Sequence, residues 1–149
     1  MQILDSLAAV RAERTPSGTM RLVAAEAFAA GEAVMELEGT VVAQPSRYTL
    51  QIGRQSHLAP RADGDDLWRF LNHSCRPNAW VNGGRLIALA PIAAGEEITF
   101  DYNCTEYEMA EPFGCRCGHC DGAEIRGFRH LNDDQRRARS GRIAAYLLH

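Results

Sequence analysis

The chain has 149 residues, 46% of them hydrophobic, and a net charge of −3 at pH 7. That length predicts one ordinary domain with room for a real core, and it excludes a second full domain. The mildly acidic balance argues against a protein that binds nucleic acid through phosphate contacts and suits a basic peptide better, so we expect no direct nucleic-acid partner.

The sequence shows no sign of a membrane or secretory segment. No apolar run approaches the roughly 20 residues that a membrane-spanning helix needs. The N-terminus also lacks the basic and then apolar pattern of a signal peptide. We therefore expect no membrane partner and a soluble, cytoplasmic protein, while the oligomeric state stays unknown.

The N-terminal part predicts short strands joined by turns. Residues 5–14 are ambiguous between a strand and a frayed helix. Thr15-Pro16-Ser17-Gly18 predicts a turn, and a strand follows at 21–25.

One short phrase occurs twice along the chain. Phe28-Ala29-Ala30-Gly31-Glu32 precedes a predicted strand at 33–37, and Ile92-Ala93-Ala94-Gly95-Glu96 precedes another at 97–102. Each copy pairs an apolar anchor with a glycine turn that leads into a strand. The pattern predicts two equivalent β-turn-β units.

The middle of the chain also predicts strands. Residues 47–52 alternate like a half-buried strand, and the polar loop 61–66 is expected to cap a short helix. Asn82-Gly83-Gly84 is a strong hairpin signal between strands at 79–81 and 85–90. Many short strands and few helices indicate a mostly-β domain of small sheets.

The last predicted element runs from Asp133 to Leu148 and is helical. Asn132 or Asp133 can cap its N-terminus. Gly141 weakens the middle of the helix, so one kinked helix and two short helices are both open.

A polar stretch lies at the centre of the sequence, with the residues Arg69-Phe70-Leu71-Asn72-His73-Ser74-Cys75-Arg76-Pro77-Asn78. It gathers side chains that can form hydrogen bonds or bind metal, and no apolar periodicity explains them. Pro77 and Asn78 predict a bend before the next strand. The stretch is therefore a candidate site, and its alternative is a capped helix end with a buried cysteine.

Five cysteines form an odd set, which argues against a disulfide framework and favours metal or isolated thiols. Cys115, Cys117 and Cys120 offer three thiolates from one tight loop, whereas tetrahedral structural zinc binds four ligands. His119 is a competing ligand, although its place between two of these cysteines suits the same metal poorly. Cys104 is expected to be an ordinary small buried residue.

Three motifs occur in a fixed order and carry a family resemblance. Residues 72–78 read Asn-His-Ser-Cys-x-Pro-Asn, residues 95–102 read Gly-Glu-Glu-Ile-Thr-Phe-Asp-Tyr, and residues 115–117 read Cys-Arg-Cys. Together they resemble the SET-domain protein lysine methyltransferases with a post-SET zinc motif. The resemblance runs from about Gly18 to Gly122.

The resemblance implies a SET-domain fold of several small β-sheets. In that fold the segment 72–75 threads beneath a loop to form a pseudoknot, which would bring Asn72 and His73 beside Tyr102 at one rigid site. The chain then divides into a SET domain at 1–109, a post-SET zinc-binding loop at 110–124 and a C-terminal helical extension at 125–149. By resemblance, Cys75 supplies the fourth zinc ligand beside Cys115, Cys117 and Cys120.

The implied chemistry is methyl transfer from S-adenosylmethionine to the uncharged amine of a lysine in a protein or peptide. Tyr102 is the expected catalytic residue, with an orienting and electrostatic role, because a phenol with a pKa near ~10 is a poor base at neutral pH. Phe100 and Tyr48 are expected to line the lysine channel, and phenylalanine at 100 favours di- or trimethylation. The expected cofactor-binding residues are Met20, Arg21, Arg69, Asn72, His73 and Phe113.

The sequence departs from the family pattern at several places, among them the short spacing of Cys117 and Cys120 and two positions near the N-terminus. The Gly-x-Gly cofactor loop of the family falls on Thr19-Met20-Arg21, and Leu37 replaces a common tyrosine. These departures keep open an alternative, a SET-fold module that binds a peptide or the cofactor with little or no turnover. A zinc ribbon for nucleic acid is disfavoured by the acidic balance. All 16 basic residues are arginines, so the enzyme would have no lysine of its own to methylate.

Overall fold

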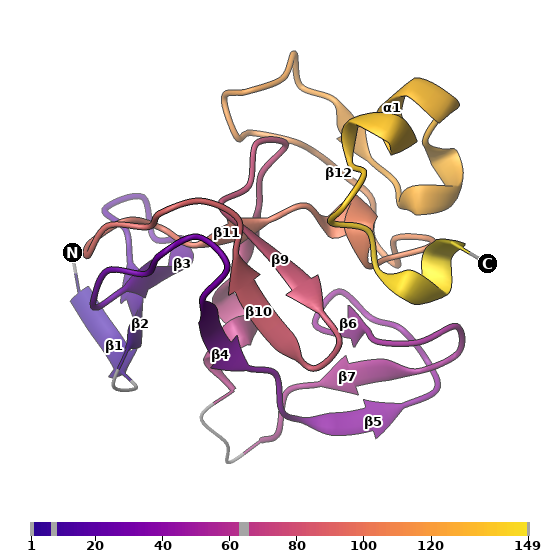
Figure 1. The fold of residues 1–149 in the computed structure, drawn as a ribbon. Helices are drawn as coiled ribbons and strands as arrows, with labels where there is room; N and C mark the ends of the chain where they lie inside the picture. Colours follow the sequence, from indigo (N-terminus) through magenta and orange to yellow (C-terminus); the bar gives the residue numbers. More distant parts are fainter. Residues whose placement is uncertain (1, 7–8, 63–65, 149) are drawn as a thin grey trace.

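The computed structural model describes residues 2–6, 9–62 and 66–148. Over these residues, thirteen short strands form five small sheets, joined by a few 3₁₀ turns and one short α-helix (Figure 1). The predicted mostly-β architecture is confirmed. None of the helices in the described part of the chain has the length and apolar character needed to span a bilayer.

Within the ambiguous segment 5–14, residues 5–6 and 10–14 belong to strands of the N-terminal sheet, and residues 7–8 lie outside the described residues. The members of this sheet are β1 (Gln2–Ser6), β2 (Val10–Arg14) and β3 (Met20–Ala24), antiparallel in that order. The predicted turn is present, since the N–H of Gly18 donates to the carbonyl of Thr15 at 2.9 Å and Gly18 has a φ of 92°. Leu22 and Ala24 lie on one face of β3 and are buried in the main core, while Val23, on the opposite face, is buried as well.

The central sheet has the order β4-β10-β9 and confirms the predicted hairpin. Its strands are β4 (Ala33–Glu36), β9 (Ala79–Asn82) and β10 (Arg85–Ala88). Gly83 takes the left-handed conformation, with a φ of 64°, that a two-residue hairpin loop demands. Val81 and Leu86, neighbours across the two strands, are buried in the core.

A third sheet comprises β5 (Thr40–Val42), β6 (Leu50–Gln51) and β7 (His57–Ala59). The prediction of a strand over 47–52 is wrong for most of its length, because only Leu50–Gln51 pairs. The residues before it form a turn instead. Ser46 and Thr49 stabilise that turn, since the N–H of Ser46 donates to Thr49 Oγ1 at 2.9 Å and the Thr49 hydroxyl donates to the Ser46 carbonyl at 3.0 Å.

The short 3₁₀ helix η1 (Leu67–Phe70) leads into the central polar stretch. Asp66 lies at its N-cap, within the loop predicted to cap it, while residues 63–65 of that loop lie outside the described residues. The Asp66 carboxylate does not cap the helix. It is buried and binds Arg61 through the backbone N–H at 2.7 Å and the guanidinium at 2.7 and 3.0 Å.

The two repeated phrases form matching turns that pair with each other. Phe28 and Ile92 exchange backbone hydrogen bonds of 2.8 and 2.9 Å, so the predicted equivalence is confirmed. Gly31 and Gly95 both take positive φ values, 84° and 91°. The strand predicted at 97–102 is shorter than expected, since only β11 (Thr99–Phe100) is paired as a strand.

Residues 96–100 lie between two other segments of the chain. On one side, the N–H of Ala24 donates to Glu96 and the N–H of Ile98 donates to Leu22. On the other side, β11 pairs in parallel with β8 (Asn72–His73). This arrangement brings the central polar stretch beside Tyr102, as expected, whereas the threading itself stays a prediction.

The remaining elements follow β11 and cover one end of the molecule (Figure 1). They are η2 (Tyr102–Cys104), β12 (Phe113–Gly114), β13 (Glu124–Ile125), η3 (Phe128–His130), α1 (Asp133–Ala138) and η4 (Ala145–Leu148). Of the two predicted caps, Asn132 caps α1, and it forms a full capping box with Gln135. Of the two open alternatives for 133–148, two short helices are present, and Gly141 lies in the irregular stretch between them with a φ of 89°.

Candidate functional site

Asn72 connects three segments at the edge of the parallel strand pair. Its side-chain amide donates to the carbonyl of Met20 at 2.9 Å and to a Glu97 carboxylate oxygen at 2.8 Å. The residue is nevertheless exposed to solvent. Met20 and Asn72, both predicted to bind the cofactor, are therefore in contact, and Arg21 is the next residue on the same strand.

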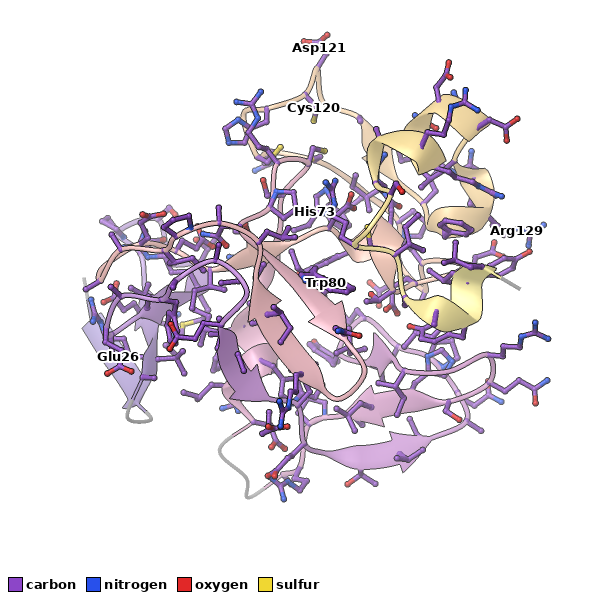
Figure 2. All side chains as sticks on the ribbon, viewed as in Figure 1. Glu26, His73, Trp80, Cys120, Asp121 and Arg129 are labelled. Atoms are coloured by element: carbon purple, nitrogen blue, oxygen red, sulfur yellow. The ribbon has the colours of Figure 1, made fainter. Side chains whose placement is uncertain are left out.

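The His73 imidazole lies inside the protein between Tyr102 and the cysteines. Its Nδ1 accepts the backbone N–H of Tyr102 at 3.0 Å, and its Nε2 lies 3.4 Å from the sulfur of Cys75. Burial lowers the pKa of His73, which favours the neutral ring. Because Nδ1 is an acceptor, the proton of the neutral ring resides on Nε2 and faces the Cys75 sulfur. Figure 2 shows His73 in the interior of the molecule, with Cys120 on the loop above it.

Tyr102 stands at the start of η2, next to two other aromatic rings. Its hydroxyl donates to the carbonyl of Leu71 at 2.5 Å. Its ring centroid lies 4.9 Å from that of Phe100 and 5.8 Å from that of Phe113. Burial, reinforced by nearby carboxylates, raises the pKa of Tyr102 well above its usual range, so the phenol is a neutral hydrogen-bonding group.

A cavity open to solvent lies beside Tyr102. Leu71, Phe100 and Tyr102 line its inner wall, while Tyr48 and Arg69 line it from exposed positions. Phe100 and Tyr48, the two predicted channel residues, thus share one cavity. Arg69, predicted to bind the cofactor, also lies at this cavity, where its guanidinium covers the Phe70 ring at 4.3 Å.

Sequence reasoning missed a buried ion pair behind Tyr102. Asp101 is 1% exposed, and its carboxylate accepts the Nε–H of Arg139 at 2.6 Å. The guanidinium of Arg142 forms a second ion pair with the same carboxylate, at 3.6 Å. The same carboxylate caps η2 by accepting the N–H of Asn103, and it lies 3.6 Å from His73 Nδ1. Asp101 therefore links the C-terminal segment, defined here as residues 127–148, to the candidate site. No local pattern identifies a partner 38 residues away.

Four cysteine sulfurs converge beside His73. They all lie within 4.8 Å of one another, with 3.7 Å between Cys75 and Cys115 and 3.9 Å between Cys117 and Cys120. A ZnS₄ tetrahedron with bonds of about 2.3 Å has sulfur separations of roughly 3.8 Å. The sulfur set therefore fits tetrahedral zinc. The cluster joins the central stretch to residues 114–123, which we call the cysteine loop.

Backbone N–H groups surround these sulfurs. Burial opposes ionisation of Cys117, but donors from the Cys75 and His119 backbones, together with the neighbouring thiols, lower its pKa to about 6. Burial raises the pKa of Cys75 and Cys115, which share the cluster. His119 contributes its backbone and not its imidazole to the set of donors. Cys104 lies apart from the cluster, buried as predicted.

Residues 19–103 match the family model described as SET domain. Two similar curated relatives are both named histone-lysine N-methyltransferase, H3 lysine-36 specific. The relative from Yarrowia lipolytica is 38% identical over 119 residues, and the match covers 65% of this chain. The one from Candida albicans is 37% identical over 94 residues, or 58% of this chain. The chain spans only 15% and 11% of the lengths of these relatives.

Solved structures share the fold. Crystal structures of KRYPTONITE, in complex with mCHG DNA and SAH, and with mCHH DNA, an H3(1-15) peptide and SAH, match with TM-scores of 0.63 and 0.61. They cover 79% and 76% of this chain, and this chain covers 29% and 28% of theirs. Sequence identity is 23% and 22%, so this likeness shows the architecture alone.

Proposed function

Because this chain belongs to the SET domain family, we propose that it is an S-adenosylmethionine-dependent protein-lysine N-methyltransferase. The observation that carries the proposal is the hydrogen bond between His73, the neighbour of Asn72 on β8, and Tyr102, which lines a cavity together with Phe100. The names of the relatives make a histone H3 peptide the first substrate to assay.

The residues around Asn72 suit a cationic cofactor. The Met20 carbonyl and the Glu97 carboxylate, both bound to the Asn72 amide, are oxygen acceptors at a solvent-exposed edge. A carbonyl has two lone pairs, so Met20 retains one acceptor site. S-adenosylmethionine has an ammonium and a sulfonium group, and when bound it supplies an electrophilic methyl group for in-line displacement.

The imidazole of His73 is already engaged inside the protein, so we assign this residue a scaffolding role with only its backbone available to the cofactor. It fixes the N–H of Tyr102 and contacts Cys75. Phe113 packs against the same imidazole, with 6.0 Å between ring centroids, and presents an apolar face beside it. We propose that Phe113 covers the adenine ring.

The cysteine cluster fits structural zinc, held by Cys75, Cys115, Cys117 and Cys120. A four-sulfur site without an open position is structural, because catalytic zinc keeps one position for water or substrate. The ion would join the cysteine loop to the central stretch at the residue that contacts His73. Zinc would therefore stabilise the position of Phe113 without taking part in chemistry.

The chain accelerates transfer by positioning its groups. The Tyr102 hydroxyl donates its hydrogen to the carbonyl of Leu71. The lone pairs of the Tyr102 oxygen therefore remain available as acceptors at the cavity wall. Phe100 is buried and has no hydroxyl, so this wall leaves room for an amine that already carries a methyl group. We therefore propose di- or trimethylation. Preorganised polar groups in a site that excludes water can supply several kcal/mol of this acceleration.

Tyr102→Phe tests the proposal, because it keeps the ring packing and deletes the hydroxyl. We expect methyl transfer to fall by on the order of 10²-fold or more, with cofactor affinity little changed. The assay uses labelled cofactor with H3 peptides. Since the chain has no lysine, label on the enzyme itself should stay near background.

Two outcomes would change the assignment. Full activity in Tyr102→Phe would remove Tyr102 from the reaction. Wild-type protein that binds cofactor but methylates no lysine-bearing peptide would favour the binding module over the enzyme.

A further inference from the structure

Glu106 is a buried carboxylate at the cavity beside Tyr102. It is 9% exposed and lines the cavity together with Leu71, Phe100 and Tyr102. Its Oε2 accepts the N–H of Gln51 at 2.9 Å and the hydroxyl of Thr105 at 2.8 Å. Its Oε1 receives no hydrogen bond from the described residues. One oxygen of the carboxylate is thus anchored and the other is available.

The local backbone explains why this carboxylate shares the wall with the phenol. The N–H of Glu106 donates to the carbonyl of Tyr102 at 2.9 Å, which closes one helical turn. Residues separated by one turn lie on the same side of the chain. The carboxylate and the phenol therefore face one cavity, although Glu106 lies outside the motif that ends at Tyr102.

Glu106 has no cationic partner in the part of the chain that the structure describes. Two exposed arginines, Arg47 and Arg69, line the same cavity, yet neither forms an ion pair with the Glu106 carboxylate. Burying an unpaired carboxylate costs free energy, and a glutamine of the same shape would avoid that cost. The arrangement indicates a cation that comes from outside the chain.

We propose that Glu106 binds the ammonium group of the substrate lysine in this cavity and accepts its proton before methyl transfer, an inference that rests on the proposed function. An N–H bond of the ammonium breaks, and an O–H bond forms at Oε1. The amine is left neutral with its lone pair free, and the Glu106 carboxylate becomes a carboxylic acid. Glu106 would thereby determine the preference for a cationic side chain.

The surroundings of Glu106 set the pH at which it can act. Burial raises its pKa to about 7, against the hydrogen bonds from Gln51 and Thr105. The titratable or charged groups that face it are Tyr102, Tyr146, Glu111, Arg47 and Arg69. Both phenols have a raised pKa and stay neutral, and the other three are exposed to solvent. Glu106 is therefore a base above about pH 7 and a carboxylic acid below it.

Glu106→Gln is the variant that tests this role. Glutamine keeps the volume and offers one carbonyl oxygen to Gln51 and Thr105, so the fold should survive. We expect kcat/KM to fall by on the order of 10²-fold, as for the loss of a positioned base. The wild-type rate should decline as the pH falls below about 7, and the variant should lose this limb. Glu111→Gln, at an exposed position of the same cavity, is the matched control.

A binding measurement separates this inference from the proposed function, because it needs no turnover. n-Butylammonium copies the lysine side chain, and n-butanol is its neutral counterpart. By NMR titration at pH 8, wild type should prefer the ammonium by about 10-fold, a difference of about 1.4 kcal/mol. This preference should vanish in Glu106→Gln, persist in Glu111→Gln and weaken in wild type at pH 6.

Equal binding of the two probes by wild type, or an unchanged preference in Glu106→Gln, would overturn the role of Glu106. A preference that behaves as expected in a protein without methyl transfer would instead support ammonium binding and refute the enzyme.

Discussion

Two segments hold the turn at Tyr102 from different sides, and they do so by different means. The cysteine loop is mostly exposed, and Cys115 alone among residues 114–123 is buried. The C-terminal segment has a small core of Phe128, Ala144 and Leu147, and its Arg139 reaches the buried Asp101. The first segment has its cluster of cysteine sulfurs, which fits the proposed zinc, whereas the second has packing and ion pairs built into the chain.

This difference leads us to expect that the cysteine-loop side of the site is ordered only when metal is bound. A loop without an apolar core gains its order from metal binding, and the free energy of binding then becomes folding free energy. The C-terminal segment needs no such ligand, since Asn103, Cys104 and Thr105 all bond to it through side-chain or backbone oxygens. The cofactor side, where Phe113 lies, should therefore be more labile than the side that holds Asp101.

Metal removal should produce the largest effect and separate the two segments. After treatment with a strong chelator, we expect methyl transfer to fall by about 10²-fold or more, because Phe113 and Cys75 lose their fixed positions. Hydrogen exchange should rise over residues 114–123 while residues 127–148 stay protected.

Native mass spectrometry of the untreated protein should show one zinc ion. Cys75→Ser should reduce the metal content, and Cys104→Ser is the matched control outside the cluster. Apoprotein in the native spectrum would contradict the metal, and simultaneous loss of protection in both segments would contradict the comparison.

The sequence predicted those parts that local patterns determine. The hairpin at Gly83, the helix cap at Asn132 and the paired glycine turns all follow from residues close together in the chain. The cysteine cluster was predicted in full only by resemblance, because the spacing of the trio leaves the fourth ligand undefined. The strand expected at 47–52 was wrong outside Leu50–Gln51, because Ser46 and Thr49 form the hydrogen bonds of a turn just before that pair.

The parts that the sequence did not predict depend on distant partners. The contact between Asp101 and Arg139 joins two segments with no common motif, and the C-terminal segment holds several other arginines. Glu106 had a weak signal, since it follows Tyr102 by one helical turn. Its burial follows from the contact with Gln51, 55 residues earlier, which no local pattern indicates.

Arg139→Gln tests whether the C-terminal segment supports the site through Asp101. Removing one partner of a buried pair leaves an uncompensated charge, so we expect a loss of about 3 kcal/mol in the free energy of unfolding, moderated by Arg142. Thermal or urea unfolding measures this loss. Arg137→Gln, two residues earlier in α1, is the control; the side chain of Arg137 has the exposed Asp134 as its described partner, so stability should change by less than about 0.5 kcal/mol.

The variant should also alter the environment of His73, which lies beside Asp101. We expect the cofactor affinity to change less than the rate of transfer, since the Asn72 contacts remain. Unchanged stability would show that Arg142 alone compensates Asp101, and the contrast between the two segments would then be weaker.

Tyr146→Phe addresses a polar contact in the same segment. The Tyr146 hydroxyl lies 2.5 Å from the carbonyl of Gln51 and 2.8 Å from that of Thr105, two residues that also bind Glu106. Its loss leaves two partly buried carbonyls without this donor, and we expect a cost of about 1 to 2 kcal/mol. Differential scanning calorimetry should detect the lower melting temperature. A cost near zero would show that water replaces the phenol at this surface.

Asn132→Ala should have the smallest effect and define how far the C-terminal segment influences the site. The side-chain oxygen of Asn132 accepts the backbone N–H of Gln135 at 2.8 Å, and the side-chain oxygen of Gln135 accepts the backbone N–H of Asn132 at 2.8 Å. Loss of such a cap costs about 1 kcal/mol, and α1 has no buried residue that would amplify the loss. Because Arg139 lies just beyond α1, fraying would reach the site only if the ion pair with Asp101 depended on a complete helix. We expect unfolding free energy to fall by about 1 kcal/mol with methyl transfer unchanged. Asn132→Asp, which preserves the cap, should restore stability. A parallel loss of activity in Asn132→Ala would mean that α1, and not the Arg139 side chain alone, positions Asp101.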